Sequence, residues 1–156
     1  QEVIDGRTEW VMMEHEGPGC LTKFWTPFFY YDFNNRVGPN IRVYLDGAKT
    51  PAIDESYIKL VTGQGSIGKP WAAYSARAGN LYLPIPFARH LRVEWRGSIK
   101  QLHFYHLQVR RYAVGTRVES FTAPASVPFE VVPALTNCPS GSFSGAPDVP
   151  VGASAE

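Results

Sequence analysis

The sequence has little of the features that mark membrane proteins and nucleic-acid-binding proteins. No apolar run approaches the roughly 20 residues that a membrane-spanning helix requires. Lysine and arginine together number 15, against 14 for aspartate and glutamate, so the net charge gives no reason to expect a nucleic acid or a membrane surface as a partner. We therefore expect a soluble chain with uncharged partners.

The sequence is also poor in groups that would hold a metal ion or a cofactor. Cys20 and Cys138 are too far apart for a metal-binding knuckle and permit one disulfide or two free thiols; we favour free thiols, because Cys20 lies in an apolar pattern and Cys138 in a proline-rich tail. His103 and His106 are three residues apart, so a strand places them on opposite faces, where they cannot chelate one metal ion. The glycine-rich segment 63–68 lacks the ending of a phosphate-binding loop. We expect neither a metal nor a cofactor.

Aromatic residues, glycine and proline are frequent, which is typical of β-sandwiches and turns. Aromatic residues make up 13% of the chain, with 14 glycines and 13 prolines. Within residues 80–95, apolar positions alternate on each side of a break at residues 88–90, which predicts two strands. Pro84 and Pro86 point their missing N–H groups the same way, which suits an edge strand; a direct role in ligand contact is the alternative.

The remaining patterns also predict strands joined by turns. Asp46-Gly47 directly follows an alternating segment and predicts a hairpin. Asp54 and Glu55 are adjacent and face opposite ways on a strand, so they form no ready catalytic pair. The expected strands lie at residues 8–14, 20–29 with an interruption at Pro27, 41–45, 48–53, 57–61 and 101–114.

The length and the change in composition predict one domain followed by an arm. A chain of 156 residues is long enough for a single core. From residue 123 the composition changes to proline, alanine, serine and valine. We expect an all-β sandwich of two antiparallel sheets in residues 1–122 and an extended arm or linker in residues 123–156, with one extra strand near residues 129–132.

A polar loop at residues 30–39 is the first candidate for recognition. It carries Tyr31, Asp32, Asn35 and Arg36 before Gly38-Pro39, and loops of this kind often hold binding residues. The alternative is a connection in which the Asn and Asp side chains bond to their own backbone.

Four motifs taken together resemble glycoside hydrolase family 172, whose founding members act on fructofuranose and arabinofuranose linkages. They occur in the family's order and spacing, and the resemblance covers roughly residues 9–121. The motifs are GPGCLTKFW at residues 17–25, IRVYLDG at 41–47, YLPIPF at 82–87 and GTRVESF at 115–121.

This resemblance implies two tandem jelly rolls per subunit, assembled into trimers or multiples of them, with a fold related to double jelly-roll capsid proteins. The chain matches only the first roll, and residues 151–156 resemble the point where a second roll would begin. A Ser-Ser-Tyr-Asp-Arg segment that normally precedes the first roll is absent. The chain begins at Gln1 and not at methionine, which indicates that a signal peptide, a tag or the rest of a longer protein has been removed.

The resemblance places the two catalytic glutamates of the family in the second roll, after a Gly-Thr-Glu-Asp-Tyr type motif that this chain lacks. A retaining glycosidase needs two carboxyl groups about 5 Å apart, and neither can be assigned to a residue here. Whether the chain is an enzyme is therefore left open. If these residues are the whole mature protein, we expect no hydrolysis; Glu94 and Glu119, both expected to face solvent, are the acids to test.

Two functions remain open. The first is the amino-terminal half of a secreted, carbohydrate-active hydrolase that forms a homo-oligomer. The second is a non-catalytic extracellular jelly roll that binds carbohydrate or self-assembles through its sheet edges and its tail. Aromatic faces and planar hydrogen-bonding groups hold furanosides, so the candidate sugar contacts are Trp25, Tyr31, Asp32, Asn35, Arg36 and Trp71; a core position is the alternative for each tryptophan.

Overall fold

Two antiparallel sheets make up most of the protein. The computed structural model describes residues 2–4, 7–27, 39–97 and 104–122. The first sheet has the order β1-β2-β9-β4-β5, and its strands are β1 (Glu2–Ile4), β2 (Arg7–Glu16), β9 (His90–Arg96), β4 (Asn40–Leu45) and β5 (Ile53–Ser56). The second has the order β10-β3-β7-β6, with β8 paired to β3; its strands are β10 (His106–Arg111), β3 (Gly19–Pro27), β7 (Ala78–Leu81), β6 (Ala72–Ser75) and β8 (Ile85–Phe87).

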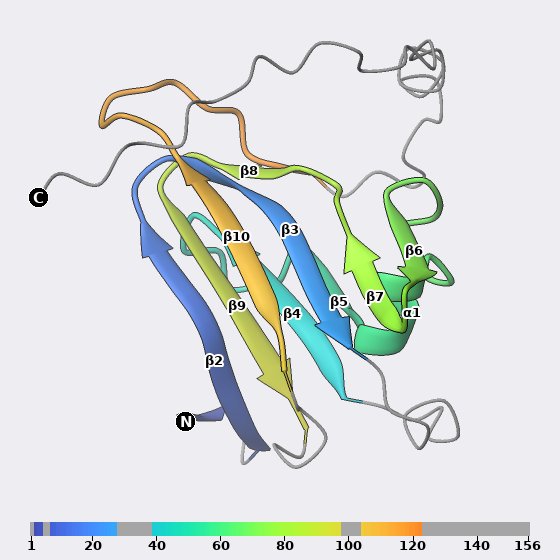
Figure 1. Cartoon of the computed structure of the whole chain (residues 1–156). Coiled ribbons are helices and arrows are strands. Elements are labelled where there is room, and N and C mark those ends of the chain that lie inside the picture. The colour runs from blue at the N-terminus through green and yellow to red at the C-terminus, as the bar shows by residue number, and fades with distance from the viewer. Residues whose placement is uncertain (1, 5–6, 28–38, 98–103, 123–156) are drawn as a thin grey trace, which may run out of the picture.

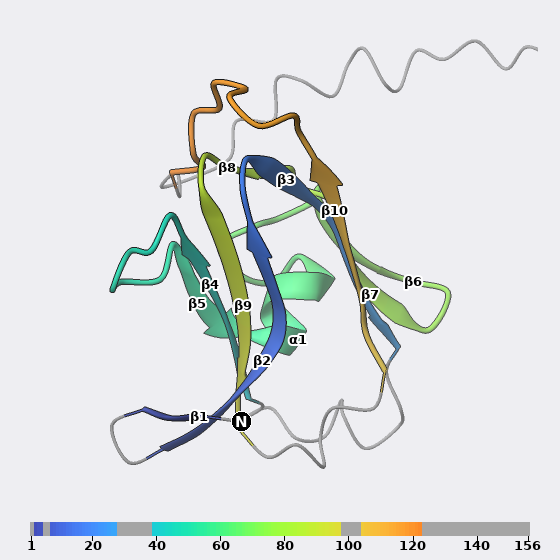
Figure 2. The same cartoon turned by 90° about the vertical axis from the view of Figure 1, so that its left-hand side faces the viewer.

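The two sheets face each other, and the chain crosses repeatedly between them (Figure 1). The crossings from β2 to β3, from β3 to β4 and from β8 to β9 each change sheet, which is the winding of a jelly roll. The single helix of the described residues, α1 (Tyr57–Thr62), lies between the sheets in Figure 2. The prediction of an all-β sandwich of two antiparallel sheets is confirmed.

Strand alternation builds the core. On β9, Leu91, Val93 and Trp95 are fully buried, and the Trp95 ring lies against Tyr57 of α1 with a centroid distance of 5.0 Å. The intervening residues of β9 face away from the second sheet, because successive side chains of a strand point to opposite faces. This face of the first sheet carries the charged residues described below.

The prediction of a strand at residues 57–61 is wrong, because this segment is the helix α1. Tyr57, Leu60 and Val61 are buried, and their spacing of three and four residues matches one face of a helix. Gly63 ends the helix in a left-handed conformation with φ of 74° and donates its N–H to the Lys59 carbonyl. The segment was too short for its period to separate helix from strand.

Other strand bounds differ from the predictions in detail. The predicted strand before the break at residues 88–90 is two strands, β7 and β8, and Pro86 lies in β8, which pairs only with β3, as expected for proline in an edge strand. The hairpin at Asp46-Gly47 is confirmed, with positive φ at both residues, but the return strand begins at Ile53. The last strand, β10, spans only His106–Arg111 within the predicted 101–114.

A close approach between β3, β8 and β10 requires glycine at position 19. A Cβ added there would lie 2.6 Å from the Phe87 ring and 2.8 Å from the Arg110 carbonyl oxygen. We expect Gly19→Ala to lower the free energy of unfolding by roughly 1–3 kcal/mol, because overpacking forces neighbouring atoms to shift. Gly68→Ala, where a Cβ would meet nothing within 4 Å, is the matched control. Urea unfolding of both variants measures the difference; equal stabilities would contradict the prediction.

Some predictions fall outside the described residues. They include the polar loop at residues 30–38, His103, and the whole arm of residues 123–156 with its expected strand at 129–132. The boundary between the sandwich and the arm therefore stays a prediction. No helix of the described part of the chain is long and apolar enough to cross a membrane.

Candidate functional site: a charged face with a buried carboxyl pair

The outer face of the first sheet carries acids and arginines that alternate across its strands. Pairing of β2 with β9 and of β9 with β4 places Glu9 opposite Arg96 and Arg42 opposite Glu94. Asp54 of β5 lies opposite Arg42. Opposite charges therefore meet across neighbouring strands, where such pairs stabilise a sheet.

Glu9 and Glu94 form a buried carboxyl pair at the centre of this face. Each is only 1% exposed, and Oε2 of each is buried without a hydrogen-bond partner among the described residues. Burial, followed by the hydrogen bond to Glu94 and the charge of Glu94, raises the pKa of Glu9 to about 7. Glu9 therefore holds a proton in a substantial fraction of the molecules at neutral pH.

Three arginines surround the pair. Arg42 donates from Nη1 to Glu9 Oε1 at 2.9 Å and from Nε to Asp54 at 3.0 Å. Arg92 donates from Nε to Glu94 Oε1 at 2.5 Å, and Arg96 Nε lies 3.7 Å from Glu9 Oε1. With Glu14, which lies 3.5 Å from Arg92, four carboxyl groups face three guanidinium groups. A single proton on Glu9 makes the charges of these carboxyl and guanidinium groups sum to zero.

The expectation that Glu94 faces solvent is wrong, whereas Glu119 is exposed. Glu94 does lie on the outer face, as alternation predicts, but the side chains around it exclude water. Exclusion of water is a property of the neighbouring strands and their long arginines, and the residues next to Glu94 in the sequence do not reveal it.

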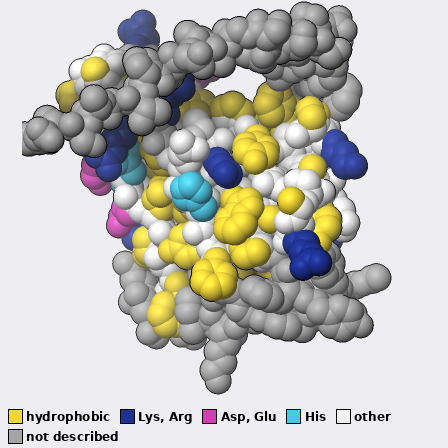
Figure 3. Space-filling model, in the orientation of Figure 1, with side chains coloured by type: hydrophobic (Ala, Val, Ile, Leu, Met, Phe, Trp, Pro, Cys, Tyr) yellow, Lys and Arg dark blue, Asp and Glu magenta, His cyan; other side chains and the backbone are white. Residues whose placement is uncertain are grey.

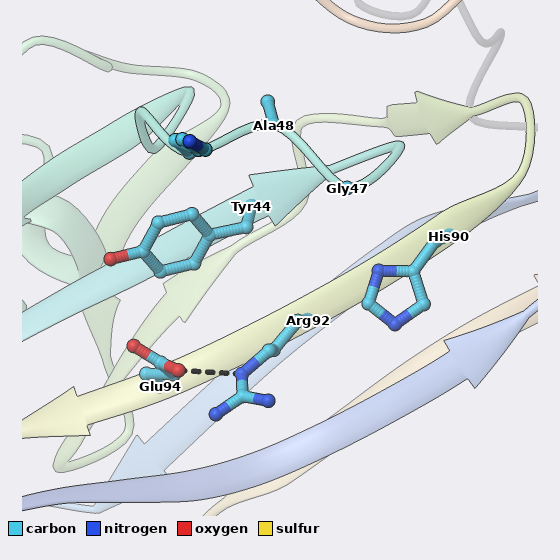
Figure 4. Close-up of a pocket in the computed structure, with 7 residues that line it drawn as sticks. Tyr44, Gly47, Ala48, His90, Arg92 and Glu94 are labelled. Atoms are coloured by element: carbon cyan, nitrogen blue, oxygen red, sulfur yellow. Dashed lines mark hydrogen bonds and ion pairs between the residues drawn. The ribbon is translucent and has the colours of Figure 1, made fainter. Parts of the chain in front are cut away.

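A pocket opens beside the pair, between β9 and the β4–β5 hairpin. It has a volume of about 350 Å³ and is lined by Tyr44, Gly47, Ala48, Lys49, His90, Arg92 and Glu94. Figure 4 shows the Tyr44 ring over the Arg92–Glu94 ion pair, with His90 further along β9 and the hairpin above. Burial raises the pKa of the Tyr44 hydroxyl, so this group is protonated and able to donate at neutral pH.

The turn of the β4–β5 hairpin, which forms one wall of the pocket, is held by hydrogen bonds to residues outside the hairpin. Asp46 accepts hydrogen bonds from the backbone N–H groups of Arg89 and His90 and from the Ser120 hydroxyl. Burial opposes ionisation of Asp46, but these donors outweigh it and hold the pKa of Asp46 below its usual value. The segment after β10 is thereby tied to the β4–β5 turn.

The chemistry available to this site is binding and proton exchange. Glu9 and Glu94 are both buried, whereas glycoside hydrolysis requires two carboxyls that can reach a sugar held between them. No group of three or more His, Cys, Asp or Glu side chains in the described residues could hold a metal ion. The pocket instead offers one aromatic face and several hydrogen-bonding groups, a lining suited to a small polar ligand.

The glycine-rich segment 63–68 is hydrogen-bonded to the side chain of Glu55. Glu55 accepts hydrogen bonds from the backbone N–H and the hydroxyl of Ser66. These donors therefore already bond to a carboxylate of the same chain. Cys20, in β3, is a buried free thiol, and burial raises its pKa, so it is protonated and unreactive at neutral pH.

Neither Trp25 nor Trp71, the two proposed sugar contacts that the structure describes, is among the residues that line this pocket. Trp25 lies on the outer face of the second sheet, because its neighbour Phe24 is buried in the core. Trp71 is partly buried against the core, and its indole N–H is buried without a hydrogen-bond acceptor. Tyr31, Asp32, Asn35 and Arg36 lie outside the described residues, so their assignment stays a prediction.

Sequence reasoning missed Glu9, Arg42, Tyr44 and Arg92. A signal was present, because polar residues alternate with buried ones in β4 and β9. This alternation shows that Arg42 and Arg92 share a face with other polar residues of their own strand. It does not show that β4 and β9 are neighbours, which is what brings these residues to Glu94.

Comparison with known proteins places the fold in a family. No curated protein matches the chain. A family model described as the GH172 first beta-sandwich domain matches residues 1–127. This range includes every described strand and all residues of the charged face. The chain therefore belongs to the GH172 family, and residues 1–127 are its first β-sandwich domain.

Proposed function

We propose that this chain is the sugar-binding and scaffolding first sandwich of a secreted glycoside hydrolase that acts on fructofuranosides or arabinofuranosides. Membership of the GH172 family over residues 1–127 is the observation that carries the proposal. The fold alone would not suffice, because β-sandwiches host many functions.

The pocket on the first sheet is our proposed site for a furanosyl unit. Its volume of about 350 Å³ lies at the small end of the range for ligand pockets. Tyr44 offers a ring face, and His90, Arg92 and Glu94 offer groups that bond to sugar hydroxyls. The Arg92–Glu94 ion pair is already formed, so little rearrangement is needed to bind.

The catalytic carboxyls of the proposed enzyme belong to another part of the assembly. The Glu9–Glu94 pair supports this view because both carboxyls are buried and Glu9 does not line the pocket. We further propose that the protein works as a homo-oligomer, trimeric or a multiple of three, so that the first sandwich contributes subunit contacts as well as sugar binding.

Ligand-observed NMR tests the binding role. Short fructofuranosyl and arabinofuranosyl oligosaccharides should receive saturation transfer from the purified chain, and Tyr44→Ala should weaken binding about 10-fold, the effect of losing ~1.4 kcal/mol of stacking and hydrogen bonding. Tyr112→Ala removes a tyrosine that is 36% exposed and lies outside the pocket, so it should leave binding unchanged. Equal binding by the wild type and Tyr44→Ala would reject the pocket.

The same protein should release no fructose or arabinose from these oligosaccharides. Glu9 and Glu94 are both buried, which leaves no room for a sugar between their carboxyls. Sugar release can be followed by chromatography over many hours. Turnover that disappears in Glu94→Gln would overturn the view that catalysis lies elsewhere.

A further inference from the structure

The outer face of the second sheet differs in character from that of the first. Phe24, Leu81 and Leu107 of this sheet are buried in the core, so their neighbours Trp25, Asn80 and His106 point outward. Strand pairing sets these three side by side, because Trp25 lies opposite His106 on one side and opposite Asn80 on the other. They form a row across β10, β3 and β7.

Aromatic side chains extend along this face. Phe104 is 63% exposed and Tyr82 is 48% exposed, and Trp25 between them is partly exposed. Figure 3 views this face and shows hydrophobic side chains gathered over the middle of the sheet, with a histidine and basic side chains among them. We call Phe104, Trp25 and Tyr82, with the row above, the aromatic strip.

The described strands of this sheet carry basic side chains and no acidic ones. No aspartate or glutamate occurs in β3, β6, β7 or β10, and Figure 3 shows acidic side chains only at its left edge. Lys23 lies with its Nζ 6.0 Å from the centre of the Tyr82 ring, a cation–π geometry. Arg110 and His106 are exposed on the neighbouring strand.

A fixed amide lies beside the aromatic rings. Asn80 donates from Nδ2 to the Ser75 hydroxyl at 3.1 Å and to the Ala73 carbonyl at 3.2 Å, and accepts from the Tyr82 hydroxyl at 3.3 Å. Tyr82 is therefore held by Asn80 at its hydroxyl and by Lys23 at its ring face. A ring fixed in this way loses little conformational freedom when a ligand stacks on it.

We propose that the aromatic strip binds an extended acidic polysaccharide, whose sugar rings stack on Trp25, Tyr82 and Phe104 while its carboxylate or sulfate groups face Lys23 and Arg110. Aromatic faces favour the C–H surface of pyranose or furanose rings, and the cations select for negative charge because the described strands of this face carry no acid to oppose them. The small number of cations favours a glycan over a nucleic acid, which needs a basic groove that tracks its backbone.

The choice of a carbohydrate as the ligand rests on the carbohydrate-binding role proposed above, but the site lies on a different sheet. The pocket beside Tyr44 lies on the first sheet and the aromatic strip on the second. A protein that binds neutral furanosides at Tyr44 and ignores acidic polysaccharide would reject the strip alone, and the reverse result would reject the pocket alone.

Isothermal titration calorimetry with oligogalacturonate, and with a neutral galactan fragment of the same length, tests the proposal. The wild type should bind the acidic chain and show no heat of binding with the neutral chain. Lys23→Glu should weaken binding about 10-fold through charge reversal, and Trp25→Ala about 10-fold through loss of stacking. Arg117→Glu, the same reversal at an exposed arginine outside the strip, should keep the wild-type affinity.

Other outcomes would overturn the proposal. Equal binding of the neutral and acidic chains would reject charge selection, and stronger binding of polyuridylate than of oligogalacturonate would make the strip a nucleic-acid site. Light scattering that shows an oligomer converted to monomers by Lys23→Glu would make it a subunit interface. Lys23 is not buried, so its variant should fold, and circular dichroism and the melting temperature confirm the fold of both variants.

Discussion

Replacing Arg42 with methionine is expected to lower the free energy of unfolding by about 3 kcal/mol at pH 8, because the buried Glu9 carboxylate then keeps only the more distant Arg96, at 3.7 Å, as an ion-pair partner. Arg42 bonds to Glu9, which is 1% exposed. Methionine keeps most of the apolar volume of the arginine stem. Urea unfolding followed by tryptophan fluorescence measures the change.

The effect of this substitution should depend on pH. Near pH 5 Glu9 is already protonated in the folded wild type, since its pKa is about 7. Losing Arg42 then removes hydrogen bonds and the ion pair with Asp54, at a cost of roughly 1 kcal/mol. Arg110→Met changes an exposed arginine on β10 and should shift stability by no more than about 0.5 kcal/mol at either pH. A penalty for Arg42→Met that is equal at both pH values would show that the charge of Glu9 does not matter.

The second large effect is a loss of stability as pH rises, which Glu9→Gln should remove. The pKa of Glu9 is about 7 in the folded protein against 4.5 ordinarily, so between these values the folded chain holds a proton that the unfolded chain releases. Stability from this proton is complete below pH 4.5 and lost above pH 7, a change of about 3 kcal/mol. Glutamine cannot ionise, so Glu9→Gln should exceed the wild type by this amount at pH 8 and match it near pH 4.5.

The comparison must be a difference between the two proteins, because other groups titrate nearby. Burial lowers the pKa of His15, which adds stability as pH rises through about 6.5, and the lowered pKa of Asp46 removes stability at low pH. Both groups are present in each protein and cancel in the difference. The groups that face Glu9 itself are Glu94, Arg42, Arg96 and Asp54. If the plots of unfolding free energy against pH were parallel for the wild type and Glu9→Gln, the raised pKa of Glu9 would be ruled out.

Local patterns predicted most of the strands. Alternation in β4 and β9 and the turn at Asp46-Gly47 depend on side-chain direction and on backbone conformations that few residues adopt, and both are readable from neighbouring residues. The helix α1 was missed because Tyr57, Leu60 and Val61 satisfy a short strand and a single helical turn equally well. Tertiary packing decided in favour of the helix. The helix α1 lies between the two sheets (Figure 2), where its apolar residues are buried.

The balance of charge over the whole sequence hides how the charges are distributed in the fold. Fifteen basic against 14 acidic residues predicted uncharged partners. The fold places the acids of β2, β5 and β9 on the first sheet, and gives the second sheet strands without acids. A neutral chain thus presents a positively charged face, which a count over the whole sequence averages away.

By itself the sequence determined the fold class, the edge position of Pro86 and the family motifs, because these follow from interactions between near neighbours and from residues at fixed spacing. Only the tertiary structure decided that Glu9 meets Glu94 and that water is kept from both. Alternation fixes the face of a strand on which a residue lies, but the pKa of that residue depends on which strands pair and on what they bury, and those are properties of distant parts of the chain.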